Sequence, residues 1–174
     1  MDSKFIEFVQ EQTAIGSAGA GGPTSAEQDK QRWLSKLAEL CNSVDGWLRA
    51  YKKMGIKTTA KTVSINEEQT GTYQAPQVEI TVGSAVVKLK PIGAFLIGAW
   101  GRVDMEGPRG VCRFILVPKR ATTTLFAFRT EPGSYQVASA DLVWKIMPTP
   151  PEMHYVELNG DVFLEMLMKV VRGE

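Results

Sequence analysis

The fold of this protein is decided by residues 84–120, which read SAVVKLKPIGAFLIGAWGRVDMEGPRGVCRFILVPKR. Two apolar runs in this stretch flank the segment EGPRG, residues 106–110. Glycine permits positive φ and proline presets φ, so this segment has the composition of a turn. We therefore predict a β-hairpin in which residues 98–105 pair with residues 111–117, at the centre of an antiparallel sheet.

Period-two alternation of apolar and polar residues extends to both sides of this hairpin. It predicts further strands over residues 57–65, 77–82, 85–90, 122–129, 139–147 and 154–158. Gly83 and Ser84 form a two-residue connection typical of a tight hairpin. The proline-rich segment PTPP, residues 148–151, is expected to end the strand before it, because proline has no backbone N–H.

A long helix is predicted over residues 25–54, ahead of the strands. Thr24 and Glu27 fit a capping box at its start, and Gly55 stands where a helix-ending glycine belongs. Its apolar residues repeat at alternating spacings of four and three, as in a heptad pattern, and are Trp33, Leu37, Leu40, Val44, Trp47, Tyr51 and Met54. Two interpretations stay open: this seam packs on the chain's own sheet, or it pairs with a helix of another chain.

A second helix is predicted over residues 160–172, with Asn159 as its N-cap. It has so few polar positions that we expect it to be buried nearly all round. The fold class is therefore α+β. We expect a curled antiparallel sheet of about seven or eight short strands, barrel-like or sandwich-like, covered by a long N-terminal helix and a short apolar C-terminal helix.

The chain divides into three parts by composition. Residues 1–15 form an arm with a short helix candidate that contains Phe5 and Phe8. Residues 16–23, GSAGAGGP, have the composition of a flexible linker. Residues 24–174 are predicted to form a single α+β domain, with its β region over residues 57–158.

Charge and composition indicate an ordinary globular protein with 174 residues and a net charge of +1. The charge is uneven, since residues 84–120 contain seven basic and two acidic side chains, a local balance of +5. No apolar run is long enough to span a membrane and no signal peptide is recognised, so we expect a cytoplasmic protein without membrane contact. Cys41 and Cys112 are expected to be buried free thiols.

Catalytic motifs are not found in the sequence. The single histidine, His154, follows a proline cluster and is expected to be a surface or edge residue, and Glu67-Glu68 is the only adjacent acidic pair. No Cys/His group has the spacing of a zinc site, so we expect neither a metal nor another cofactor. An enzyme would need a carboxylate site assembled from distant positions, which we keep as a second alternative.

The function that remains by elimination is a non-catalytic protein-interaction subunit of a bacterial cytoplasmic system, such as an accessory, inhibitor, immunity or antitoxin-like protein. Its partner would be another protein chain, in a hetero-complex or a homo-oligomer. The expected interaction residues are Phe5, Phe8, Trp33, Leu37, Leu40, Val44 and Trp47.

The first alternative is a nucleic-acid-binding protein that uses a basic face of the sheet. Positive charge combined with an aromatic side chain is the chemistry of a stacking platform for single strands. The residues that would form this platform are Lys88, Lys90, Trp100, Arg102, Arg113, Lys119 and Arg120.

Overall fold

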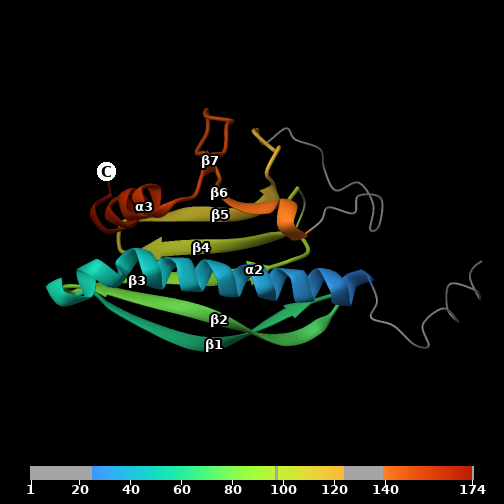
Figure 1. Ribbon diagram of the computed structural model, residues 1–174, viewed down its shortest axis with the longest axis horizontal. Coiled ribbons are helices and arrows are strands. Elements are labelled where there is room, and N and C mark those ends of the chain that lie inside the picture. The colour runs from blue at the N-terminus through green and yellow to red at the C-terminus, as the bar shows by residue number, and fades with distance from the viewer. Residues whose placement is uncertain (1–24, 97, 124–138, 174) are drawn as a thin grey trace, which may run out of the picture.

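A computed structural model of the chain describes residues 25–96, 98–123 and 139–173. It is an α+β structure in which an antiparallel sheet carries a long helix before it and a short helix after it (Figure 1). The elements in chain order are α2 (Ser25–Leu48), the 3₁₀ helix η1 (Arg49–Met54), β1 (Lys57–Glu67), β2 (Gly71–Val82), β3 (Ala85–Gly93), β4 (Gly101–Gly107), β5 (Gly110–Pro118), the 3₁₀ helix η2 (Ser139–Asp141), β6 (Leu142–Ile146), β7 (Val156–Glu157) and α3 (Gly160–Arg172).

The seven strands of the described residues form one open sheet in which each strand pairs with the next one along the chain. β1 and β7 are its two edges. The predicted tight turn at Gly83-Ser84 is confirmed, since Val82 pairs with Ala85. The central hairpin is also confirmed, and its connection is shorter than the EGPRG segment because Gly107 and Gly110 still pair with each other.

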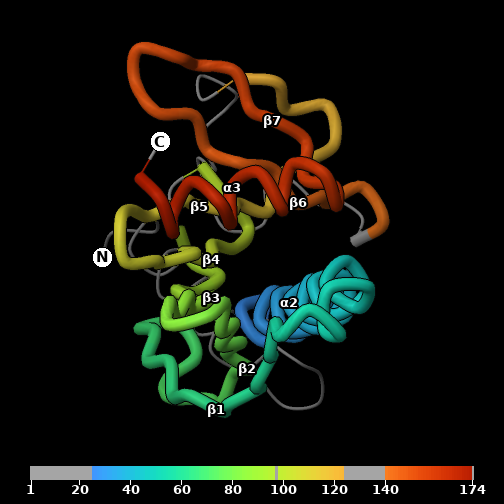
Figure 2. Tube along the Cα trace, turned by 90° about the vertical axis from the view of Figure 1, so that its left-hand side faces the viewer, coloured from blue at the N-terminus to red at the C-terminus, as the bar shows by residue number. Residues whose placement is uncertain are grey.

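Both helices pack on one face of the sheet, where α2 lies nearest β2 and α3 lies over β3, β4 and β5 (Figures 1 and 2). Alternation along the strands turns Val87, Leu89, Val103, Met105 and Phe114 toward this face. They form one buried cluster with side chains of both helices. The amphipathic strands and helices therefore build their core by covering one side of the sheet.

Four residues of the predicted helical seam lie in this core. For these four, the seam packs on the chain's own sheet. Trp33, Leu37, Leu40 and Val44 are each at most 3% exposed. The next buried position is Leu48 rather than Trp47, so the stripe follows the period of an ordinary straight helix and departs from a heptad repeat.

The C-terminal end of the seam leaves the core. Residues 49–54 form the 3₁₀ helix η1, which has three residues per turn and therefore rotates the following side chains away from the stripe. Tyr51 is 37% exposed and Met54 is 81% exposed. Gly55 ends the helix with a left-handed φ of 102°, as the sequence predicts.

Several predicted strands have different boundaries in the structure. β2 begins six residues earlier than predicted, β3 ends three residues later, and β7 is shorter than the strand predicted over residues 154–158. β4 begins at Gly101, three residues later than predicted, because Gly98 has a φ of 79° and the chain turns between Leu96 and Ala99. The strand predicted over residues 139–147 begins at Leu142, since residues 139–141 form η2.

The C-terminal helix is less buried than predicted. Asn159 caps it as expected, accepting a hydrogen bond of 3.0 Å from the N–H of Val162. Only Phe163, Leu167 and Val170 are buried, however, and Met168 is 51% exposed. The sheet covers one stripe of α3 and leaves both of its flanks open.

Several predictions lie outside the described residues. These are the arm with Phe5 and Phe8, the linker over residues 16–23, the cap at Thr24 and nearly all of the strand over residues 122–129.

Candidate binding groove

The feature that singles out one side of this molecule is that β5 extends beyond the end of β6. β6 pairs with Phe114–Pro118 only, while the pairing of β4 with β5 continues to Gly110. The residues that would continue β6 are PTPP, and three of these four have no N–H to donate to a neighbouring strand. On the side away from β4, residues 110–113 therefore have no strand beside them in the described structure, except for one bond from Met147.

The backbone of Val111 faces this open side. Arg113 accepts a hydrogen bond of 2.9 Å from the N–H of Met147 on the side where β6 lies. Alternate residues of an antiparallel strand direct their N–H and C=O groups the same way, so Val111, two residues earlier, directs its own toward the same side. No described strand pairs with them there.

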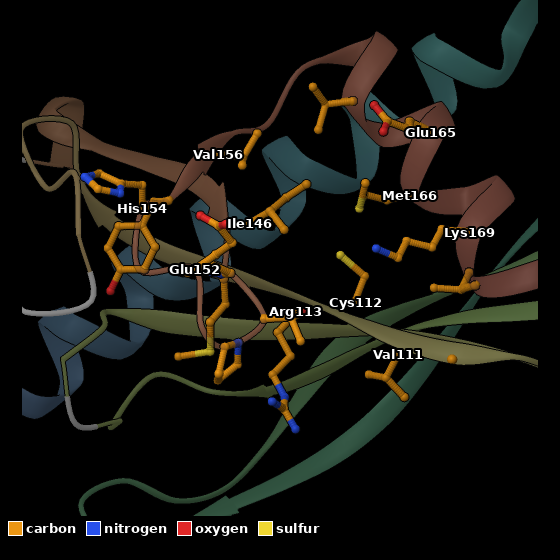
Figure 3. Close-up of a pocket in the computed structure, with 18 of the residues that line it drawn as sticks. Val111, Cys112, Arg113, Ile146, Glu152, His154, Val156, Glu165, Met166 and Lys169 are labelled. Carbon is orange, nitrogen blue, oxygen red and sulfur yellow. The ribbon is translucent and has the colours of Figure 1, made fainter. Parts of the chain in front are cut away.

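A pocket of about 660 Å³ lies along this open edge, which is a size typical of ligand sites. We call it the β5 groove. One wall is the edge of β5 itself, a second is the flank of α3, and a third is the loop between β6 and β7 (Figure 3). Its apolar lining includes Val111, Cys112, Ile146, Met147, Val162, Met166 and Val170.

The far end of the groove is closed by contact between the β4–β5 turn and the last turns of α3. The N–H of Arg109 donates to the carbonyl of Val170 over 2.9 Å. Gly107 lies so close to Val170 that a Cβ there would overlap the helix backbone. This contact holds α3 beside the strand edge and sets the width of the groove.

Five charged side chains line the groove, namely Arg109, Arg113, Lys169, Glu152 and Glu165. None of them has an ion pair among the described residues. In Figure 3 the ammonium group of Lys169 points into the groove toward the thiol of Cys112, and the Glu165 carboxylate lies apart from it with Met166 between them. One cation thus points into a largely apolar pocket.

The thiol of Cys112 is not prepared for nucleophilic chemistry. Burial raises its pKa to about 11, although the charge of Lys169 acts in the opposite direction. A thiol with so high a pKa remains protonated near neutral pH, whereas a reactive cysteine needs the thiolate.

The seam residues expected to bind a partner do not form a surface. Trp33, Leu37, Leu40 and Val44 are buried in this chain's own core, so a partner has no access to them in the folded protein. Trp47 is half-buried and packs on Phe163 with ring centroids 5.3 Å apart. This corrects the expectation for the seam, and Phe5 and Phe8 lie outside the described residues.

The basic set expected for nucleic-acid binding is divided by the structure. Trp100 is 7% exposed and packs against Leu116 and Leu142, so its ring has no free face for a base. Lys88, Arg102 and the other strand cations lie on the sheet face away from the helices.

Acidic residues on the same strand or on a neighbouring one offset much of this positive charge. Arg102 binds Asp104 through two hydrogen bonds of 2.7 Å, which also raise the pKa of Arg102. Lys90 forms a 2.5 Å ion pair with Glu106, and Lys88 stands opposite both Glu79 and Glu106. Lys119 and Arg120 follow the end of β5 and are exposed.

The two acidic residues at the β1–β2 turn have different surroundings. Glu67 accepts hydrogen bonds of 2.8 and 2.9 Å from the N–H groups of Ala94 and Phe95, and a third from the hydroxyl of Tyr73. Glu68 is exposed. Glu67 therefore ties the β1–β2 turn to the end of β3. Among the described residues, no three His, Cys, Asp or Glu side chains are arranged to hold a metal ion.

A second, smaller pocket of about 340 Å³ lies on the opposite flank of α3. It is lined by Tyr51, Ile56, Val82, Leu164, Leu167, Met168, Val171 and Arg172. Its lining is almost entirely apolar, and no strand edge borders it.

Comparisons with protein-family models, with curated proteins and with solved structures found no match to this chain. In the described part of the chain, no helix has the length and apolarity needed to cross a bilayer.

Proposed function

We propose that this protein is a non-catalytic protein-binding subunit, and that its β5 groove holds a short extended segment of a partner protein. The observation that carries the proposal is the open edge of β5 at Val111, placed directly beside an apolar pocket. An extended peptide can add a strand to such an edge, with backbone hydrogen bonds supplying affinity and the pocket supplying specificity.

The dimensions of the edge limit the length of the bound segment. Residues 110–113 span about 14 Å at about 3.4 Å per residue, so about four residues of a partner can lie beside them. The bound segment would lie where β6 would run if it continued beyond Met147. The carbonyl of Arg113 already accepts a hydrogen bond from Met147 there.

The other open edge of the sheet is a poorer site. β1 is long and most of its side chains are exposed, but Lys57 and Lys61 lie on it, and lysines on edge strands discourage pairing with another strand. Residues of β1 line neither of the two pockets described above. We therefore place the bound segment at β5.

The proposal is tested by selecting short displayed peptides on the full chain and mapping the selected peptides by amide chemical shifts. We expect shifts to concentrate at residues 110–113 and along the facing flank of α3. The decisive pair of variants is Val111→Pro, which removes an N–H that points away from β4, and Val111→Ala, which keeps it.

Val111→Pro should weaken peptide binding at least about tenfold, because one backbone hydrogen bond is lost and the proline ring occupies the place of the N–H. Val111→Ala should change peptide binding little. Circular dichroism and urea unfolding check that both variants fold. Selected peptides that shift other residues, or that bind equally well to Val111→Pro, would overturn the proposal.

A further inference from the structure

We infer that the segment held in the β5 groove carries an acidic side chain opposite Cys112, where the ammonium group of Lys169 receives it. This inference rests on the proposed function and specifies the chemistry of its ligand. The observation behind it is that Lys169 points into the groove without an ion-pair partner among the described residues (Figure 3).

The register of an added strand places the acidic side chain. A ligand residue that exchanges hydrogen bonds with Val111 lies directly opposite it, so the ligand residue next to it lies opposite Cys112. Directly opposed residues have their side chains on the same face of a sheet. The residue opposite Cys112 therefore projects toward α3, and Lys169 is the cation on that face.

Other charges around the groove agree with this assignment. Arg113 alternates to the opposite face of the sheet, and Arg109 lies in the turn at the end of the groove. The acidic residues Glu152 and Glu165 lie on the loop and on α3, with Met166 between the Glu165 carboxylate and Lys169 in Figure 3. A carboxylate opposite Cys112 is thus nearest to a positive charge, and because Lys169 is an exposed residue, solvent partly screens that pair.

The short distance between Lys169 and Cys112 also affects the electrostatics of the thiol. The charge of Lys169 acts to lower the pKa of the Cys112 thiol, which requires the ammonium group to be near that side chain. A ligand carboxylate above Cys112 would therefore lie within the range of the same charge.

The experiment uses a selected peptide resynthesised with Glu, Gln or Lys at the position opposite Cys112, and measures its dissociation constant by fluorescence anisotropy. On the native chain we expect the Glu peptide to bind about fivefold more tightly than the Gln peptide, as for a partly screened ion pair. Lys169→Met should remove this preference, and Lys169→Glu should make the Lys peptide the tightest of the three.

The matched control is Arg172→Met. Arg172 is also in the last turn of α3, so this variant removes the same charge from the same end of the helix, but Arg172 lines the other pocket. The preference for Glu should survive in it. Equal loss in both variants would indicate a general electrostatic effect and overturn the inference.

The outcomes separate this inference from the proposed function. Peptides that need the N–H of Val111 but bind equally well with Glu and Gln would overturn the acidic ligand and leave the strand-addition site standing. Selection of no peptide at the groove would overturn both.

Discussion

Gly101 lies directly against the indole ring of Trp33, so closely that a Cβ on Gly101 would stand 2.5 Å from Cζ3 of that ring. The first residue of β4 thereby fixes the separation between α2 and the sheet. Trp33 also packs on Trp144 with ring centroids 5.9 Å apart, and the Trp144 Nε1 donates to the Lys36 carbonyl over 3.0 Å. The absence of a side chain at Gly101 thus lets Trp33, and with it α2, pack closely on the sheet.

This contact predicts opposite effects for two glycine substitutions. Gly101→Ala should lower the free energy of unfolding by about 1–3 kcal/mol, because the added methyl group overlaps a buried ring. Gly46→Ala should raise it by about 0.5–1 kcal/mol, since Gly46 is inside α2 and a Cβ there meets no atom within 4 Å. Urea unfolding measures both, and equal signs would contradict the packing described.

The burial of the helical seam predicts a large cost for truncating it. Leu40 is 3% exposed, so Leu40→Ala should lower the free energy of unfolding by about 2–5 kcal/mol through lost burial and a cavity. Met54 belongs to the same sequence pattern but is 81% exposed, so Met54→Ala should change it by less than about 0.5 kcal/mol. Thermal or urea unfolding distinguishes the two, and a small effect of Leu40→Ala would argue against an internal seam.

Glu67 is predicted to stabilise the connection between β3 and β4. Glu67→Ala leaves the N–H groups of Ala94 and Phe95 without their acceptor and should lower the free energy of unfolding by about 1–3 kcal/mol. The neighbouring Glu68 is exposed, and Glu68→Ala should have little effect. Amide hydrogen exchange of Ala94 and Phe95 provides a local measurement, which should become faster in Glu67→Ala alone.

Lys145 is a buried lysine whose ammonium group holds a loop. It is 3% exposed and donates hydrogen bonds of 2.9 and 2.7 Å to the carbonyls of Lys119 and Ala121. Lys145→Met should therefore lower the free energy of unfolding by about 1–3 kcal/mol, since two carbonyls lose their donor. Lys119→Met is the control, because the Lys119 side chain is exposed and only its carbonyl is used. Similar losses in both variants would refute this role.

The raised pKa of Cys112 predicts a pH dependence of stability. Burial raises the pKa of this thiol from 9.0 to about 11, so the unfolded chain releases the proton first as the pH rises. The stability that Cys112 contributes is therefore fully present below pH 9 and is lost as the pH rises through about 11. The difference in unfolding free energy between the native chain and Cys112→Ala should shrink from pH 8 to pH 10.5. A difference that stays constant would contradict the prediction.

Much of the fold could be predicted from the sequence because it depends on neighbouring residues. The N-cap at Asn159, the left-handed Gly55 and the two-residue turn at Gly83 each follow from a few adjacent side chains. The boundaries that were predicted wrongly depend on contacts between residues distant in sequence or on a local change of helix type. In η1, for example, Tyr51 and Met54 turn away from the buried stripe.

The candidate groove could not be found in this way. Its walls come from β5, from the loop after β6 and from α3, and only the pairing of β5 with β6 brings them together. The one sequence signal that pointed to it is PTPP, because a strand followed by three prolines leaves its neighbour's edge without a donor.

The sequence by itself determined the class of the fold, the order of its helices and strands, and the amphipathic face of each, because periodicity and capping act over a few residues. The tertiary structure alone decided which faces are accessible. It buried Trp33 and Trp100, placed Glu79, Asp104 and Glu106 beside the basic residues of β3 and β4, and left the edge at Val111 open. The physical reason is that burial and charge balance depend on which strands become neighbours, and that pairing joins residues far apart in the chain.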